Sequence, residues 1–195
     1  MNTLQPTHSD AWPRFEKPRG HRPPPIMQPL SAAPGRPLRW KQLRWFKRDF
    51  ELRAGDDSVG TLSFRSLWSY LATATSTDGT WTFKRTGFWR PEITVRVAGS
   101  DADLAVFRYK TWGNGGSLEF RDGRKSRITD KRWSTRFEIL SDRDEVLMSL
   151  RASAWKENSA EVEVGPAAAK LPEGSLLLLF GWYLAVLTRE EAAGA

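Results

Sequence analysis

The segment KQLRWFKR, residues 41–48, places four basic side chains beside Trp45 and Phe46. Cations attract phosphate, and tryptophan suits either a membrane interface or stacking on nucleic-acid bases. Arg48 falls on the same side of an alternating strand as Phe46 and Phe50. We therefore expect Arg48 to pair with a carboxylate or to lie at the mouth of a barrel. The alternative interpretation is a first strand with a solvated charged face and tryptophan at its rim.

A second basic cluster, residues 121–136, contains seven basic and two acidic side chains. Arginine and lysine side chains that converge can bind a phosphate group. Its RDGR piece is most simply a hairpin turn with Gly123 at positive φ. The positions singled out in the two clusters as candidates for binding an anion or a lipid are Lys41, Arg44, Lys47, Arg48, Arg124, Lys125, Arg127, Lys131 and Arg132.

The third candidate is the aromatic pair Phe88 and Trp89, which stands next to Pro91 in TGFWRPEI. Aromatic side chains in a loop can insert into a bilayer or can close one end of a barrel. We favour the second interpretation, in which Phe88 and Trp89 plug the barrel.

The residue inventory argues against an enzyme. The chain has no cysteine, and its two histidines, His8 and His21, lie in a proline-rich N-terminal stretch. A thiolate site, a histidine base or a histidine zinc site in the folded part is therefore excluded. No phosphate-binding loop, dinucleotide fingerprint, GxSxG or HExxH motif occurs. We expect a non-enzymatic protein without metal or cofactor.

The net charge of +7 comes entirely from the start of the chain. Residues 1–39 hold six basic and two acidic side chains, residues 40–53 hold five and two, and residues 54–195 are balanced. Such a basic arm suggests an anionic partner, although a purely solubilising tail explains it equally well. Residues 1–20 lack the apolar core of a secretory signal, so we expect a cytoplasmic protein.

Composition divides the chain into a disordered tail rich in proline and arginine (1–38), a folded domain (39–190) and a short tail (191–195). The folded part alternates apolar and polar residues in short segments separated by turn signals such as RDGR and GNGG. The predicted strands are 44–52, 58–64, 68–76, 79–86, 92–98, 103–110, 116–122, 124–129, 134–140, 145–152 and 160–164. Strands at this spacing indicate a mostly antiparallel sandwich or barrel.

The segment LPEGSLLLLFGWYLAVL ends the folded domain. Residues 175–188 carry no charge, but a membrane-spanning helix needs about 20 apolar residues. Pro172 and Glu173 are favourable at a helix start. The predicted helix, 172–188, is apolar on every face, so it must be buried on every face. We therefore predict a closed barrel of about 12 strands around this helix, with Gly181 allowing one wall to approach closely.

This architecture resembles the tubby C-terminal-like superfamily, which includes tubby domains, phospholipid scramblases and plant LURP-one-related proteins. The resemblance covers residues 40–190 and rests on WFKRDFEL, GSLEFRDGRKSRI, RWSTRFEIL and the closing LPEGSLLLLFGWYLAVL. It is closest to bacterial members without an assigned function. The resemblance implies a barrel that presents a basic surface to anionic lipid, and it implies no reaction. The cysteine-rich anchor of scramblases has no counterpart here.

Three functions remain open at this point. The leading hypothesis is a monomeric, non-enzymatic module that binds anionic phospholipid, or another acidic partner, peripherally at the inner face of the membrane. The second is nucleic-acid binding through the basic N-terminal arm. The third is a structural or protein-interaction domain without a ligand.

Overall fold

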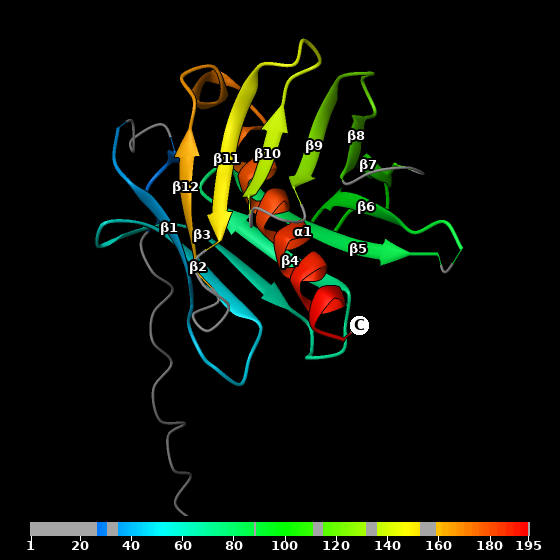
Figure 1. The fold of residues 1–195 in the computed structure, drawn as a ribbon, viewed down its shortest axis with the longest axis horizontal. Coiled ribbons are helices and arrows are strands. Elements are labelled where there is room, and N and C mark those ends of the chain that lie inside the picture. Colours follow the sequence, from blue (N-terminus) through cyan, green and yellow to red (C-terminus); the bar gives the residue numbers. More distant parts are fainter. Residues whose placement is uncertain are drawn as a thin grey trace, which may run out of the picture.

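Twelve antiparallel strands form a closed barrel, and one helix, α1, runs along its interior (Figure 1). These observations come from a computed structural model, which describes residues 27–30, 35–87, 89–110, 115–131, 136–152 and 159–194. The fold class predicted from the sequence is confirmed.

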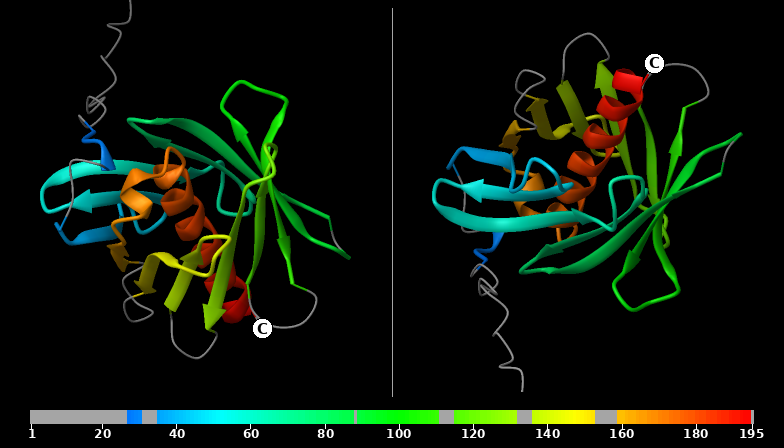
Figure 2. Two further views of the ribbon diagram at one scale, coloured as in Figure 1. Left: turned by 90° about the horizontal axis from the view of Figure 1, so that it is seen from above. Right: turned by 90° about the horizontal axis from the view of Figure 1, so that it is seen from below.

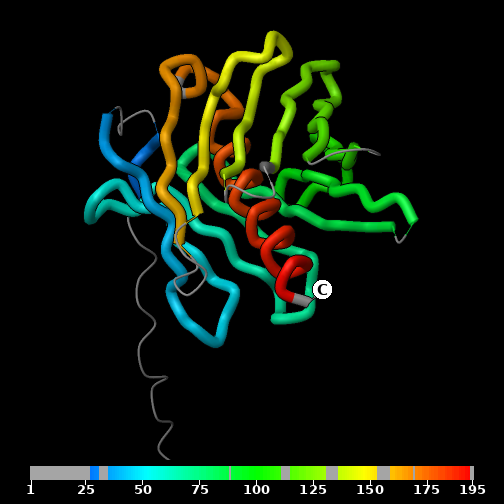
Figure 3. Tube along the Cα trace, in the orientation of Figure 1, coloured from blue at the N-terminus to red at the C-terminus, as the bar shows by residue number. Residues whose placement is uncertain are grey.

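Each strand pairs with its neighbour along the chain, and β1 pairs with β12 to close the ring (Figure 3). The elements are β1 (Leu38–Gln42), β2 (Asp49–Ala54), β3 (Asp57–Phe64), β4 (Leu71–Ser76), β5 (Gly79–Thr86), β6 (Glu92–Val97), β7 (Asp103–Tyr109), β8 (Gly116–Phe120), β9 (Lys125–Lys131), β10 (Arg136–Leu140), β11 (Val146–Ala152), β12 (Ala160–Val164), the 3-10 helix η2 (Ala168–Lys170) and α1 (Gly174–Gly194).

The strands form because their sequences alternate, and successive side chains of a strand point to opposite faces. In β6, for example, Ile93 and Val95 are fully buried while Thr94 between them is partly exposed. The ring of inward side chains then needs an apolar filling, which α1 supplies.

Helix α1 is buried without interruption from Gly174 to Leu187 and is apolar on all sides, as predicted. A Cβ atom on Gly181 would come within 2.9 Å of Ile139 Cδ1, so the wall formed by β10 does approach the helix closely here. The predicted end at residue 188 is wrong, because α1 continues to Gly194. Its last turns lie outside the apolar interior. There the charged side chains of α1 can be solvated or can form ion pairs.

Aromatic rings join the helix to the walls. Trp182 of α1 stacks on Trp40 of β1 with ring centroids 5.5 Å apart, and Tyr183 stacks on Phe64 of β3 at 5.4 Å. Large aromatic side chains bury 150–250 Å² each, and stacked pairs add a further attraction. The lumen is therefore a packed core.

The first strand begins earlier than predicted. The sequence suggests a single strand over 44–52, but β1 ends at Gln42 and residues 43–48 form a turn before β2. The Leu43 N–H donates to the Asp49 carbonyl at 2.8 Å, and the Gln42 amide donates to the Lys47 carbonyl at 2.7 Å. This turn contains no glycine, proline, asparagine or aspartate, so its sequence carries no turn signal.

Part of the predicted N-terminal tail lies against the barrel. Met27 forms a bridge with Ser58, the Gln28 N–H donates to the Ser58 carbonyl at 2.7 Å, and Leu30 is buried in the core. An apolar side chain such as Leu30 gains free energy when it leaves water, which explains this contact. Residues 1–26 and 31–34 of the predicted tail lie outside the described residues.

Candidate functional site

Helix α1 begins at one end of the barrel and finishes at the other, so the two ends can be named from it (Figure 2). We call the end where α1 begins the entry end; it carries the connections that follow even-numbered strands. We call the end where α1 finishes the exit end; the described parts of its connections are 43–48, 65–70, 87 with 89–91, 110 with 115, and 159.

Three tryptophans in the exit-end connections are almost entirely exposed. Trp45, Trp68 and Trp89 have exposed fractions of 88%, 92% and 91%. They belong to the connections β1–β2, β3–β4 and β5–β6, which are consecutive around the rim. Trp89 therefore does not plug the barrel, and that prediction is wrong; Phe88 lies outside the described residues.

Every charged residue in the described exit-end connections is basic: Arg44, Lys47, Arg48, Arg65, Arg90 and Lys110. Most basic side chains at this end also have no carboxylate partner within the part of the chain that the structure describes. The exposed ones without an ion pair are Lys41, Arg44, Lys47, Arg65, Lys84, Arg90, Lys110 and Arg151. Their positive charge is available to a partner.

The entry-end connections have the opposite character. Their acidic residues are Asp56, Asp78, Asp101, Asp122, Asp142, Asp144, Glu145 and Glu173, and their basic residues are Arg121, Arg124, Arg143 and Lys170. The strands separate the two sets by about 20 Å, since a six-residue strand rises about 3.3 Å per residue. This exceeds the Debye length of about 8 Å at physiological salt, so the two ends act separately on a charged partner.

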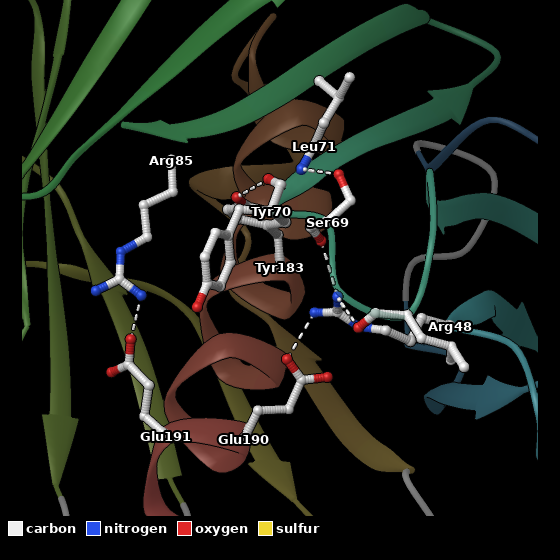
Figure 4. Close-up of polar contacts among 9 residues, drawn as sticks. Arg48, Ser69, Tyr70, Leu71, Arg85, Tyr183, Glu190 and Glu191 are labelled. Atoms are coloured by element: carbon white, nitrogen blue, oxygen red, sulfur yellow. Dashed lines mark hydrogen bonds and ion pairs between the residues drawn. The ribbon is translucent and has the colours of Figure 1, made fainter. Parts of the chain in front are cut away.

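Arg48 closes the mouth of the barrel at the exit end (Figure 4). Its side chain is 8% exposed, and its guanidinium donates to the carbonyls of Leu67 at 3.2 Å and Ser69 at 2.8 Å. It also forms an ion pair with Glu190 of α1 at 2.6 Å. Both alternatives stated for Arg48, a carboxylate partner and a place at the mouth, are therefore confirmed.

Burial dominates the electrostatics of this pair. It lowers the pKa of Arg48 and raises the pKa of Glu190, and in each case the ion pair opposes only part of the shift. Arg48 is thus a structural residue of the mouth, and its charge is already used within the fold.

A second ion pair, between Arg85 of β5 and Glu191, holds the other side of the helix end (Figure 4). Burial opposes the protonated form of Arg85, but Glu191 together with Tyr109 and Tyr70 outweighs it, and the pKa of Arg85 is raised. The Tyr183 hydroxyl donates to the Tyr70 carbonyl at 2.5 Å, and burial raises the pKa of Tyr109 to about 12. The mouth is therefore lined by neutral phenols and by cations that already have partners.

The second basic cluster does not converge on one point. Arg124 pairs with Asp122 and with Glu173, Lys125 pairs with Glu119, and Arg127 pairs with Asp144. All three basic residues lie toward the entry end, among acidic neighbours. The predicted turn is confirmed, since Gly123 has φ +89°. The side chain of Lys131 and the whole of Arg132 lie outside the described residues.

The sequence interpretation missed Trp68 and Arg65. Residues 68–76 read as a strand, so Trp68 was assigned to a wall, whereas β4 begins only at Leu71. A signal was present in the spacing, because Trp45, Trp68 and Trp89 recur about every two strands. Three further tryptophans, Trp112, Trp133 and Trp155, continue this spacing in the sequence but lie outside the described residues.

In the described ranges, no group of three or more His, Asp or Glu side chains is arranged to hold a metal ion. No helix among the described residues is long and apolar enough to cross a membrane. No family model, curated protein or solved structure matches the chain.

Proposed function

We propose that this protein is a non-enzymatic module that binds the anionic surface of a phospholipid membrane with the exit end of its barrel. The observation that carries the proposal is the group of exposed basic side chains at that end which have no ion pair in the described part of the chain. Each lysine or arginine near an anionic membrane contributes about 1 kcal/mol of attraction. A peripheral position at the inner face of the membrane follows from this role.

We also propose that the chain is a member of the tubby C-terminal-like superfamily. Support comes from the closed barrel of twelve strands around an apolar C-terminal helix. The resemblance implies a basic surface for anionic lipid. The cations without ion pairs now suggest where on this chain that surface lies.

The test compares two triple variants that change the net charge equally. Arg44→Glu, Lys47→Glu and Arg65→Glu reverse unpaired cations at the exit end. Arg121→Glu, Arg143→Glu and Lys170→Glu reverse unpaired cations at the entry end. We expect the first variant to bind vesicles of mixed neutral and anionic phospholipid at least about a hundredfold more weakly than the natural chain. The second should bind within about threefold, since only the attraction near the surface is strong. Vesicle flotation measures both.

Two outcomes contradict the proposal. One is equal recovery of the natural chain with neutral and with anionic vesicles. The other is an equal loss of binding in the two triple variants, which would show that only the net charge matters. A gel shift of single-stranded DNA that falls steeply with salt, without vesicle binding, would favour the nucleic-acid alternative. Loss of that shift on deletion of residues 1–26 would assign it to the N-terminal arm.

A further inference from the structure

Exposed apolar side chains gather at the exit end. The large apolar side chains that are exposed among the described residues are Leu43, Trp45, Phe46, Leu67, Trp68, Tyr70, Trp89, Val97 and Val146. All except Val97 and Val146 belong to the connections β1–β2, β3–β4 and β5–β6. Single exposed apolar residues are ordinary, but seven that gather at one end of a protein indicate an interaction site.

These side chains are not needed to close the barrel. Tyr183, Arg48 and Arg85 already link the end of α1 to the mouth through their contacts with Tyr70, Glu190 and Glu191 (Figure 4). Below them Trp182 and Phe64 pack the lumen. The exposed tryptophans therefore lie outside the buried core.

Their arrangement suits a broad surface. The three connections follow one another around the rim, each separated from the next by two strands. Neighbouring strands lie about 4.8 Å apart, so consecutive connections are roughly 10 Å apart along the rim and the three extend over roughly 20 Å. A partner that touches all three must present a wide face.

The residue types in the three connections favour a lipid bilayer over a nucleic acid as the partner. Each exposed tryptophan has a basic residue without an ion pair nearby: Arg44 beside Trp45, Arg65 three residues before Trp68, and Arg90 beside Trp89. Tryptophan favours the interfacial layer of a membrane, and basic side chains favour the phosphates just outside it. Stacking on nucleic-acid bases requires aromatic faces, whereas Leu43 and Leu67 have none and gain free energy only in an apolar layer.

We infer that Trp45, Trp68 and Trp89 insert into the interfacial layer of an anionic bilayer, so that the barrel stands on the membrane with its exit end down. The inference rests on the proposed function, because the basic side chains bring the surface close enough for insertion. It adds a component of binding that salt does not remove, since burial of apolar area is not screened.

The first experiment removes the indoles from the full chain. Trp45→Ala, Trp68→Ala and Trp89→Ala are combined, and binding to anionic vesicles is measured at low and at 0.5 M salt. We expect affinity to fall at least roughly tenfold for each tryptophan removed, because burying even half an indole removes about 100 Å² from water. The natural chain should keep part of its binding at high salt, and the triple variant should lose it. A thermal unfolding curve confirms that the variant is folded.

The second experiment locates insertion directly and uses the absence of cysteine from the chain. An environment-sensitive fluorophore is attached to single cysteines at Leu43→Cys and Leu67→Cys, and at Val97→Cys and Val146→Cys as matched controls. All four positions are about half exposed, but the last two lie at the entry end. Anionic vesicles should shift the emission of the first pair to the blue and leave the second pair unchanged.

The two proposals fail in different ways. If the natural chain shows no preference for anionic vesicles, the proposed function fails and the inference falls with it. If it binds anionic vesicles but the tryptophan variant binds equally at both salt concentrations, only insertion is overturned. Equal blue shifts at both ends of the barrel, or binding of single-stranded DNA in place of vesicles that depends on the three tryptophans, also overturn it.

Discussion

Arg48 joins three parts of the exit end through one guanidinium group. It starts next to β2, donates to two carbonyls of the β3–β4 connection and forms an ion pair with Glu190 of α1. Its guanidinium carbon also lies 3.6 Å from the centre of the Phe64 ring, a distance at which a cation and an aromatic face attract. No other described residue in the β1–β2 turn is buried.

Replacing Arg48 with methionine keeps the volume and removes the donors. Two carbonyls and a carboxylate then lose their partner in a part-buried region, where the cost stays below the roughly 1–3 kcal/mol expected for each fully buried group. Since the Glu190 side chain is 46% exposed, we expect a total loss of about 2–4 kcal/mol in the free energy of unfolding. Urea denaturation measures it.

Arg108→Met provides the control. Arg108 forms exposed ion pairs with Glu92 and Glu119, so its loss should cost no more than about 0.5 kcal/mol. Similar losses in the two variants would contradict the structural role assigned to Arg48.

Small residues stand where helix α1 and the barrel wall approach each other most closely. Gly181 faces Ile139 of β10 and Leu150 of β11, and Gly60 of β3 faces Leu179 of the helix. Glycine within a helix costs about 1 kcal/mol relative to alanine, so its presence at 181 reflects lack of space. The barrel is therefore fitted to the helix on two sides.

A double-mutant cycle tests this fit. Ile139→Val removes the methyl group that a Cβ atom at position 181 would meet at 2.9 Å. Alone it should destabilise by about 0.5–1.5 kcal/mol. We expect Gly181→Ala to destabilise the natural chain but to stabilise the Ile139→Val chain, where helix propensity prevails. Unfolding free energies of the four proteins give the coupling, and additive effects would show that Ile139 does not restrict position 181.

Among the described residues, the barrel is closed by its shortest ladder. In that part of the chain, strands β1 and β12 pair through three residue pairs, Leu38 with Val162, Arg39 with Glu161 and Trp40 with Ala160, whereas β4 and β5 pair through six. Fewer backbone hydrogen bonds hold this seam, although Leu38 and Trp40 anchor it from inside the core. The ring is thus least strongly joined where its chain ends meet.

Hydrogen exchange should reveal the seam. We expect the paired amides of β1 and β12 to exchange through a partial opening with a lower free energy than global unfolding, because local openings follow the weakest contacts. The amides of β5 serve as the internal reference. If the protected amides of both regions exchange only with global unfolding, the seam is no weaker than the rest of the barrel.

The sequence predicts the walls better than the connections. Ile93 and Val95 mark their strand because alternation is a local property, and the fourteen uncharged residues before Arg189 mark the buried helix. The β1–β2 turn was missed because LRWFKR lacks turn residues and continues the alternation. Phe46, which the alternation places on the same side as Phe50, is consequently exposed.

The grouping of the site residues depends on tertiary structure and is therefore harder to predict from the sequence. Arg48 was identified as anomalous from its place among apolar residues. Trp45, Trp68 and Trp89 could not be grouped from their local sequences, because only closure of the barrel places alternate connections at one end. The entry-end neighbours of Arg124 and Arg127 likewise follow only from the fold, which brings Glu173, just before α1, to Arg124 and Asp144 of the β10–β11 connection to Arg127.

The position of α1 in the chain has a consequence for synthesis. The helix leaves the ribosome after all twelve strands that enclose it. Until then the inward residues of a nascent barrel have no helix to pack against. Strand β1 also cannot pair with β12, which follows more than 100 residues later. Such non-local contacts form slowly and expose apolar surface meanwhile. A chain whose translation stops before residue 174 therefore lacks the helix that covers the inward apolar side chains. We expect chaperones and proteases to recognise that exposed surface.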